Sequence, residues 1–143
     1  MLLDANILLY ATDPASIDGP RAQQVLVDAL NGNERVALPW QTIGAYLRIA
    51  TNPRASTDPM TGDEAWGWVE QWLALDITWI PPATDATARS YSELVSKMNI
   101  TSSLVPDAML AALAIEHGQV LWSADTDFAR FPNLQWHNPL TDR

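Results

Sequence analysis

Met1-Leu2-Leu3-Asp4-Ala5-Asn6 opens the chain with a short apolar segment that ends at an aspartate. A second such segment, Val120-Leu121-Trp122-Ser123-Ala124-Asp125-Thr126-Asp127-Phe128, lies near the other end of the sequence. Short apolar runs are typical of buried parallel strands, and open parallel sheets bind ligands at the carboxyl ends of their strands. Asp4 and Asp125 therefore share one edge of an α/β sheet if the two strands are neighbours.

A third aspartate, Asp107, follows Pro106 and opens the most apolar helical stretch of the chain. Taken singly, each aspartate has a structural explanation. Asp107 suits the first turn of a helix because of the helix dipole, and Asp4 and Asp125 suit loops after strands. Their joint placement predicts a site of hard oxygen ligands, which suits Mg²⁺ or Mn²⁺.

Three polar residues flank these aspartates, and each has two interpretations. Asn6 either orients Asp4 or a metal-bound water, or it begins a helix. Ser123 either supports the site by a hydrogen bond or ends a strand. Asp127 is either a further ligand through water or the N-cap of a short turn over residues 128–131.

Apolar runs alternate with helical patterns along the whole chain. Strands are predicted at residues 1–3, 36–38, 77–80, 119–122 and 134–136. Helices are predicted from about residue 7 and over residues 21–30, 39–52, 61–75, 85–97 and 104–117. Thr61 and Glu64 have the spacing of a capping box, and Gly118 is placed to end the last helix. This alternation predicts an α/β fold with a mostly parallel sheet of four to five strands, covered on both faces.

Composition predicts one soluble domain over residues 1–143, since 48% hydrophobic content is enough for one core. The chain has no cysteine and only two histidines, which excludes disulfides and argues against a zinc site. No basic leader precedes the first apolar residues, and no apolar run approaches the roughly 20 residues of a membrane span. We therefore expect a cytoplasmic protein.

The net charge of −9 opposes binding of nucleic acid through a broad basic surface. Any phosphodiester substrate must then be held locally. Clustered carboxylates also repel one another unless a cation or a basic partner lies among them. Seven tryptophans could stack on bases, but three of them share one predicted helix, which favours packing in the core or in a dimer.

Four segments together resemble the PIN-domain ribonucleases, in particular the VapC toxins of type II toxin-antitoxin pairs. They are Leu3-Asp4-Ala5-Asn6-Ile7-Leu8-Leu9-Tyr10, the stretch 46–54, Asp107-Ala108 with residues 110–114, and Ser123-Ala124-Asp125-Thr126-Asp127-Phe128. The resemblance implies a three-layer α/β/α PIN fold and Mg²⁺- or Mn²⁺-dependent endonucleolytic cleavage of RNA. It also implies a homodimer and a VapB-type antitoxin whose C-terminal segment covers the toxin.

Residue by residue, Asp4, Asp107 and Asp125 match the family's acidic positions, while Asn6, Ser123 and Asp127 match its supporting ones. One position departs from the pattern. The family often has a glutamate just before an aromatic-Leu-Arg triplet, and this chain has Ala45 there. The missing carboxylate puts a second metal ion in doubt.

Two other functions stay open on sequence alone. A phosphatase of the haloacid dehalogenase type also uses an aspartate after its first strand. It would need a second aspartate at position 6, where this chain has Asn6, and a later lysine, of which only Lys97 exists. A PIN-like module that binds protein or RNA without cutting it is the other alternative, and Ala45 favours it.

Overall fold

The computed structural model describes residues 1–141, and within them the strands form one five-stranded sheet in which all neighbours are parallel. The strands are β1 (Leu2–Leu3), β2 (Val36–Ala37), β3 (Thr78–Trp79), β4 (Leu121–Trp122) and β5 (Trp136–His137). Their order is β3-β2-β1-β4-β5, so β1 lies in the middle between β2 and β4. The first and fourth predicted strands are therefore neighbours, which is the condition for Asp4 and Asp125 to lie at one edge of the sheet.

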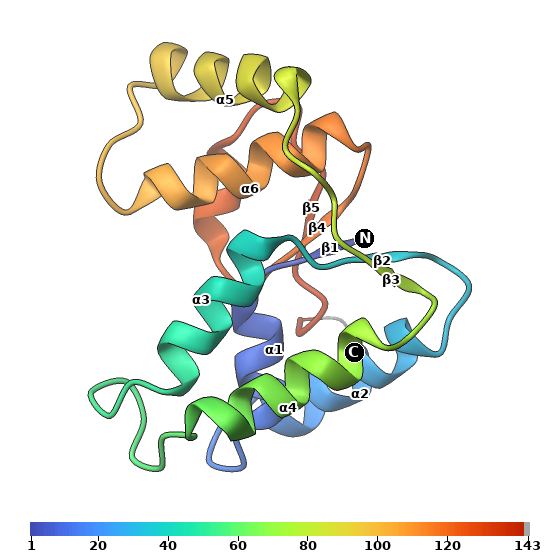
Figure 1. Cartoon of the computed structure of the whole chain (residues 1–143). Coiled ribbons are helices and arrows are strands. Elements are labelled where there is room, and N and C mark those ends of the chain that lie inside the picture. Colours follow the sequence, from blue (N-terminus) through green and yellow to red (C-terminus); the bar gives the residue numbers. More distant parts are fainter. Residues whose placement is uncertain (142–143) are drawn as a thin grey trace.

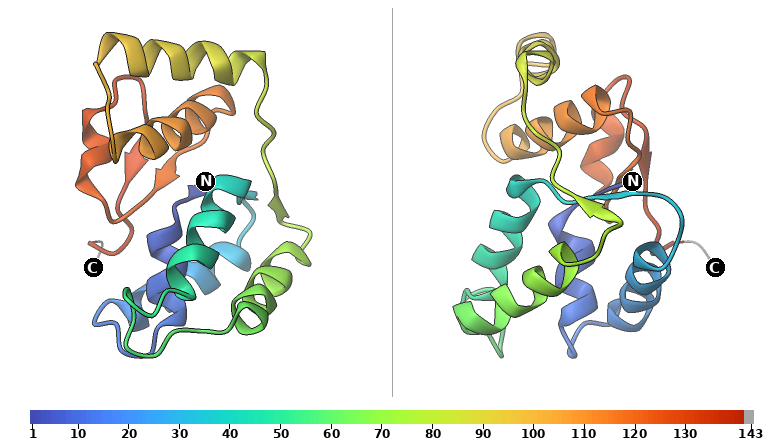
Figure 2. Two further views of the ribbon diagram at one scale, coloured as in Figure 1. Left: turned by 60° about the vertical axis from the view of Figure 1, so that its left-hand side comes forward. Right: turned by 45° about the vertical axis from the view of Figure 1, so that its right-hand side comes forward.

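Helices cover both faces of this sheet and complete a three-layer α/β/α fold (Figures 1 and 2). They are α1 (Ala5–Thr12), α2 (Gly19–Leu30), α3 (Trp40–Ala50), α4 (Gly62–Leu73), α5 (Asp85–Lys97) and α6 (Leu104–Glu116), with the 3-10 helix η1 at Thr126–Arg130. Helices α1 to α4 lie on one side of the sheet, and α6 with α5 outside it lies on the other. The predicted fold class is confirmed.

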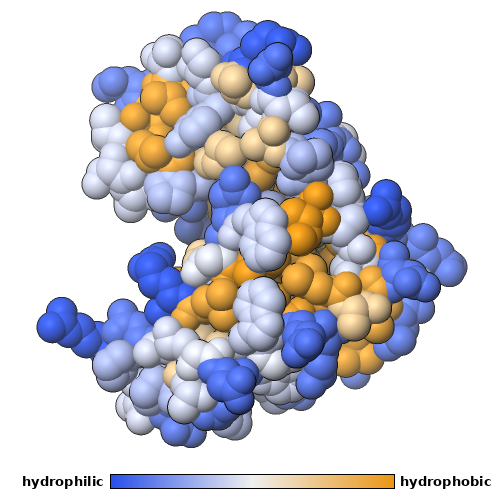
Figure 3. All heavy atoms as spheres, viewed as in Figure 1, coloured by the Kyte–Doolittle hydropathy of each residue, from blue (hydrophilic) through white to orange (hydrophobic). Residues whose placement is uncertain are grey.

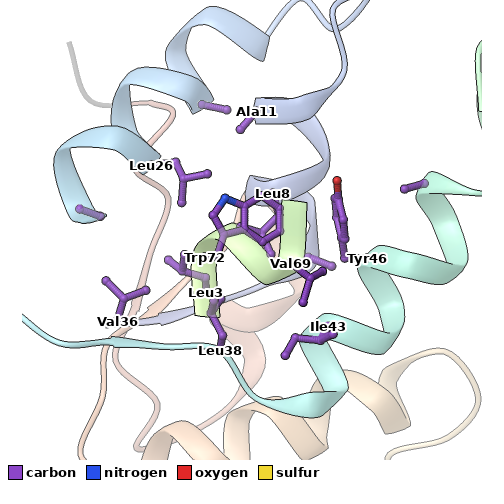
Figure 4. Packing of buried hydrophobic residues seen from close by; sticks show 14 of the residues in the cluster. Leu3, Leu8, Ala11, Leu26, Val36, Leu38, Ile43, Tyr46, Val69 and Trp72 are labelled. Atoms are coloured by element: carbon purple, nitrogen blue, oxygen red, sulfur yellow. The ribbon is translucent and has the colours of Figure 1, made fainter. Parts of the chain in front are cut away.

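Alternation within the strands divides the core in two. Leu3 and Val36 pack with α1 to α4, whereas their strand neighbours Leu2 and Ala37 pack with α6. Figure 4 shows the first cluster, in which Leu3 lies close to Trp72 of α4. Because successive side chains of a strand point to opposite faces, even two-residue strands bury apolar side chains on both sides.

Local signals in the sequence fix several helix ends. The Thr61 hydroxyl accepts a hydrogen bond from Glu64 N–H at 3.1 Å, and the reciprocal bond of the capping box is also present. Gly118 has φ of +62°, the left-handed conformation that favours glycine after a helix. Helix α5 spans the predicted residues, while the strands are shorter than their apolar runs because only part of each run forms ladder hydrogen bonds.

The tryptophans of α4 differ from one another in burial. Trp72 is buried in the core, whereas Trp66 and Trp68 are 42% and 40% exposed, and Trp40 at the start of α3 is 56% exposed. Core packing thus accounts for only one of the three tryptophans in α4. None of the helices in the described part of the chain has the length and apolar character that a membrane span requires.

Candidate metal centre

Asp4 stands where β1 passes into α1, and its carboxylate is held by three donors. As the N-cap residue of α1, it accepts a hydrogen bond at Oδ1 from Ala5 N–H at 2.7 Å. Its Oδ2 accepts from the Ser123 hydroxyl at 2.7 Å and from Asn6 Nδ2 at 3.2 Å. The position of this carboxylate is therefore set by the fold.

Asn6 and Ser123 join the carboxyl ends of β1 and β4. Asn6 Nδ2 donates to Ser123 Oγ at 3.0 Å, and Asn6 Oδ1 accepts from Ala124 N–H at 3.2 Å. Ser123 is fully buried, and its hydroxyl also accepts from Asp125 N–H at 3.0 Å. Asn6 lies in the first turn of α1 and Ser123 directly follows β4, and both also hydrogen-bond to the Asp4 carboxylate, so that a supporting role at the site stays a prediction.

A second group of carboxylates comes from α6 and η1. Asp107, in the first turn of α6, Asp125 and Asp127 each place one carboxylate oxygen within 4.8 Å of the others. Asp125 is the N-cap of η1, because its Oδ1 accepts from Asp127 N–H at 2.9 Å. The prediction of Asp127 as the N-cap of a turn over residues 128–131 is wrong, since η1 begins two residues earlier. Asp4 is outside this tightest group but close enough for its charge to act on Asp107.

Burial and neighbouring carboxylates raise the pKa values of Asp4 and Asp107. Burial raises the pKa of Asp4; hydrogen bonds from Ser123 and Ala5 oppose this rise, and the charge of Asp125 adds to it. Burial also raises the pKa of Asp107, to about 6. The charges that add to this second shift are those of Asp125, Asp4 and Asp127.

The donor set fits a hard divalent cation. All the converging ligand atoms are carboxylate oxygens, and within residues 1–141 no basic side chain forms an ion pair with Asp4, Asp107 or Asp125. Asp127 alone has such a partner, Arg130. A Mg²⁺ or Mn²⁺ ion would supply the missing positive charge with ligands that it prefers.

The structure also shows a supporting residue that the sequence did not indicate. Thr42, in the first turn of α3, is fully buried and donates its hydroxyl to Leu3 C=O at 2.7 Å, directly before Asp4. No spacing rule distinguishes it from other threonines near a helix start. Ala45, at the position of the family's glutamate, packs at the edge of the apolar core.

The surface near these elements is hollowed. In Figure 3 the molecule has a notch on its left side, between the part formed by α5 and α6 above and that formed by α3 and α4 below. Helix α6, whose first turn carries Asp107, lies above this notch. A concave surface between two parts of a fold is a common place for a ligand site.

Residues 1–134 match the PIN domain family, and the chain belongs to that family. Among curated relatives, Ribonuclease VapC33 of Mycobacterium tuberculosis is 34% identical over 139 residues, which cover 97% of each chain. Ribonuclease VapC37 of the same organism is 33% identical over 138 residues, which cover 96% of each. The family assignment excludes the haloacid dehalogenase alternative.

Solved structures share the fold at low sequence identity. The chain is similar to FitAcB from Neisseria gonorrhoeae with a TM-score of 0.69 and 19% identity, covering 98% of both chains. VapBC2 from Rickettsia felis gives a TM-score of 0.68 at 17% identity, covering 96% of both. VapC20 of M. tuberculosis, a sarcin-ricin loop cleaving toxin, gives 0.65 at 14% identity, covering 94% of this chain and 98% of VapC20.

Proposed function

We propose that this protein is a VapC-type toxin, an endoribonuclease that cleaves cellular RNA and is neutralised by a cognate VapB-type antitoxin. The observation that carries the proposal is the set of carboxylates that converge from the ends of β1 and β4 and from α6, without a basic partner at Asp4, Asp107 or Asp125 in residues 1–141. Ribonuclease relatives at 33–34% identity over nearly the whole chain support it.

Asp4, Asp107 and Asp125 are the proposed catalytic residues and the proposed ligands of one Mg²⁺ or Mn²⁺ ion. Asp127 adds negative charge beside them, and Asn6 and Ser123 keep Asp4 in place before any ligand arrives. When bound, such an ion polarises a phosphoryl oxygen and lowers the pKa of water, so that water can attack phosphorus. Asp107, whose pKa is raised to about 6, has to release its proton to act as a ligand.

Ala45 favours one ion over two. It offers no oxygen where the family often has a glutamate, and its methyl group packs at the edge of the core. A catalytically weak PIN module remains the second candidate for this reason. Titration of the protein with Mn²⁺ by calorimetry distinguishes the two, because a dead module takes up no ion that depends on Asp4 and Asp107.

The net charge of −9 supports a basic partner. The proposed antitoxin would carry a basic C-terminal segment and place an arginine among the carboxylates, where it would exclude the metal ion. A homodimer in the cytoplasm is part of the same proposal. The half-exposed Trp40 and Trp66 are apolar surface that a second copy could cover.

Cleavage of total cellular RNA tests the function directly. The purified, antitoxin-free protein is incubated with Mg²⁺ or Mn²⁺, beside an EDTA control and beside Asp4→Asn. We expect discrete fragments that disappear in both controls, while Asp4→Asn keeps or raises the thermal midpoint because a repelled carboxylate is removed. Asp76→Asn, an exposed loop carboxylate, is the matched variant that should retain cleavage. Unchanged cleavage by Asp4→Asn would disprove the site.

A further inference from the structure

Arg130 is the basic side chain that lies beside the carboxylate group. Its Nε is 3.6 Å from Asp127 Oδ1, and Asp127 is one of the three carboxylates whose ligand atoms converge. No other lysine or arginine of residues 1–141 forms an ion pair with a member of this group. Arg130 thus provides a positive charge next to the proposed metal site.

The 3-10 geometry of η1 keeps Arg130 in this place. Side chains three residues apart lie above one another in a 3-10 helix, and Asp127 and Arg130 have this spacing. The same turn is anchored in the core by Phe128 and Phe131, which are buried and in ring contact at 6.0 Å. The apolar side of η1 therefore holds its charged side at the carboxylate group.

The ion pair itself is weak enough to exchange. The side chains of Arg130 and Asp127 are 61% and 45% exposed, and exposed pairs of this kind contribute little to stability. A divalent cation among the carboxylates would weaken the pull of Asp127 on the guanidinium. A phosphate group offers that guanidinium two parallel hydrogen bonds, which a single carboxylate oxygen at 3.6 Å does not.

We propose that Arg130 leaves Asp127 and binds a phosphate of the RNA beside the bond that is cut. This inference rests on the proposed function and names the group that holds the substrate. It accounts for how a chain with a net charge of −9 binds a polyanion without a broad basic surface: one arginine and the metal ion neutralise the phosphates locally.

Binding of RNA is the direct test, with a readout that does not need cleavage. A fluorescein-labelled, mixed-sequence single-stranded RNA of 20 nucleotides is titrated with protein in Ca²⁺, by anisotropy, at several NaCl concentrations. We expect Arg130→Gln to weaken binding roughly 10- to 100-fold, as for a lost charge-assisted contact. The plot of log affinity against log salt should become less steep by about 0.7, the value for one phosphate contact on a single strand. The RNA affinity of Arg130→Lys should lie between those of the wild type and Arg130→Gln, because lysine keeps the charge without the planar guanidinium.

Two comparisons separate this role from others. Arg89→Gln removes the same charge from the exposed face of α5 and should leave the affinity nearly unchanged. Uptake of Mn²⁺, measured by calorimetry, should be as tight in Arg130→Gln as in the wild type, or tighter, because a nearby positive charge has been removed. Equal RNA affinity of the Arg130→Gln and Arg89→Gln variants, loss of Mn²⁺ uptake in Arg130→Gln, or no measurable binding by the wild type would each overturn the proposal.

Failure of the proposed function looks different. In that case the wild type shows no metal-dependent cleavage of total RNA, whatever residue 130 is. If the wild type cleaves and Arg130→Gln binds RNA as well as the wild type does, only the role of Arg130 is wrong.

Discussion

The hydroxyl of Ser123 makes three hydrogen bonds at once, which is all that a hydroxyl can make. It donates to Asp4 and accepts from Asn6 Nδ2 and from Asp125 N–H. Two of the proposed metal ligands are thus positioned by one buried oxygen atom. The fold sets the distance between them before any ion binds.

Ser123→Ala should therefore lower both stability and activity. The change removes the acceptor of the partly buried Asp125 N–H and of one of the two Asn6 Nδ2 hydrogens, which costs about 1–3 kcal/mol of unfolding free energy. Urea unfolding measures this loss, and the RNA cleavage assay measures the loss of activity. Ser92→Ala on the exposed face of α5 is the control and should change the unfolding free energy by less than about 0.5 kcal/mol. Wild-type stability in Ser123→Ala would contradict the bonds described.

The raised pKa of Asp107 predicts the pH dependence of the metal-free protein. In the unfolded chain this carboxyl loses its proton near 3.8, whereas in the folded protein its pKa is about 6. The folded state therefore binds more protons between these values, so the free energy of unfolding falls as pH rises from about 4 to 6. The raised pKa of Asp4 acts in the same direction.

Urea unfolding in EDTA at pH 4.5 and pH 7 checks this slope against Asp107→Asn. The contribution of Asp107 is absent from the variant, so its stability should fall less with rising pH than that of the wild type. A divalent cation should raise the free energy of unfolding of the wild type at pH 7, and should not raise that of the variant. Parallel pH profiles for the two proteins would contradict the raised pKa.

Gly44 of α3 is not needed for the packing of this chain. It lies inside the helix on an exposed face, and a Cβ added there would meet no atom within 4 Å. Gly44→Ala should raise the free energy of unfolding by about 0.5–1 kcal/mol, because glycine is costly inside a helix. Urea unfolding measures this gain.

Gly118→Ala is the contrasting variant and should lose stability, since its φ of +62° strains any residue with a Cβ. A less stable Gly44→Ala would contradict the open surface.

Elements were easier to predict from this sequence than the contacts of the site. Strands were recognisable as short apolar runs between helical patterns, two of which lead to aspartates, and helix α5 has the limits predicted for it. Alternation of strands and helices predicted a mostly parallel sheet, and Asp4 and Asp125 were placed at one edge on the condition that their strands are neighbours, which they are. The bond from Thr42 to Leu3 could not be predicted, because it depends on how α3 is oriented on the sheet. The pairing of Arg130 with Asp127 is local to η1, and it was missed because the turn was expected over residues 128–131 with Asp127 outside it.

At the scale of the whole molecule, the charge of −9 should make the metal-free protein sensitive to salt. Like charges repel in the compact state, and NaCl screens them. When NaCl is raised from 50 mM to 500 mM at pH 7.5 in EDTA, we expect the free energy of unfolding to rise by about 1 kcal/mol. For a chain of this length, that corresponds to roughly 4 °C in thermal midpoint. Scanning calorimetry measures the gain, and Asp107→Asn should gain less. A midpoint that falls with salt would contradict the repulsion.

The bond between Asp4 and Ser123 joins residues 119 positions apart, and it has a consequence for synthesis. A nascent chain presents Asp4 first, and Asp107, Ser123 and Asp125 follow it only about 100 residues or more later. The central strand β1 also cannot pair with its neighbour β4 until that segment has been made. On the proposed function, a chain that has been made only as far as α5 therefore lacks the assembled carboxylate site and should not cut RNA.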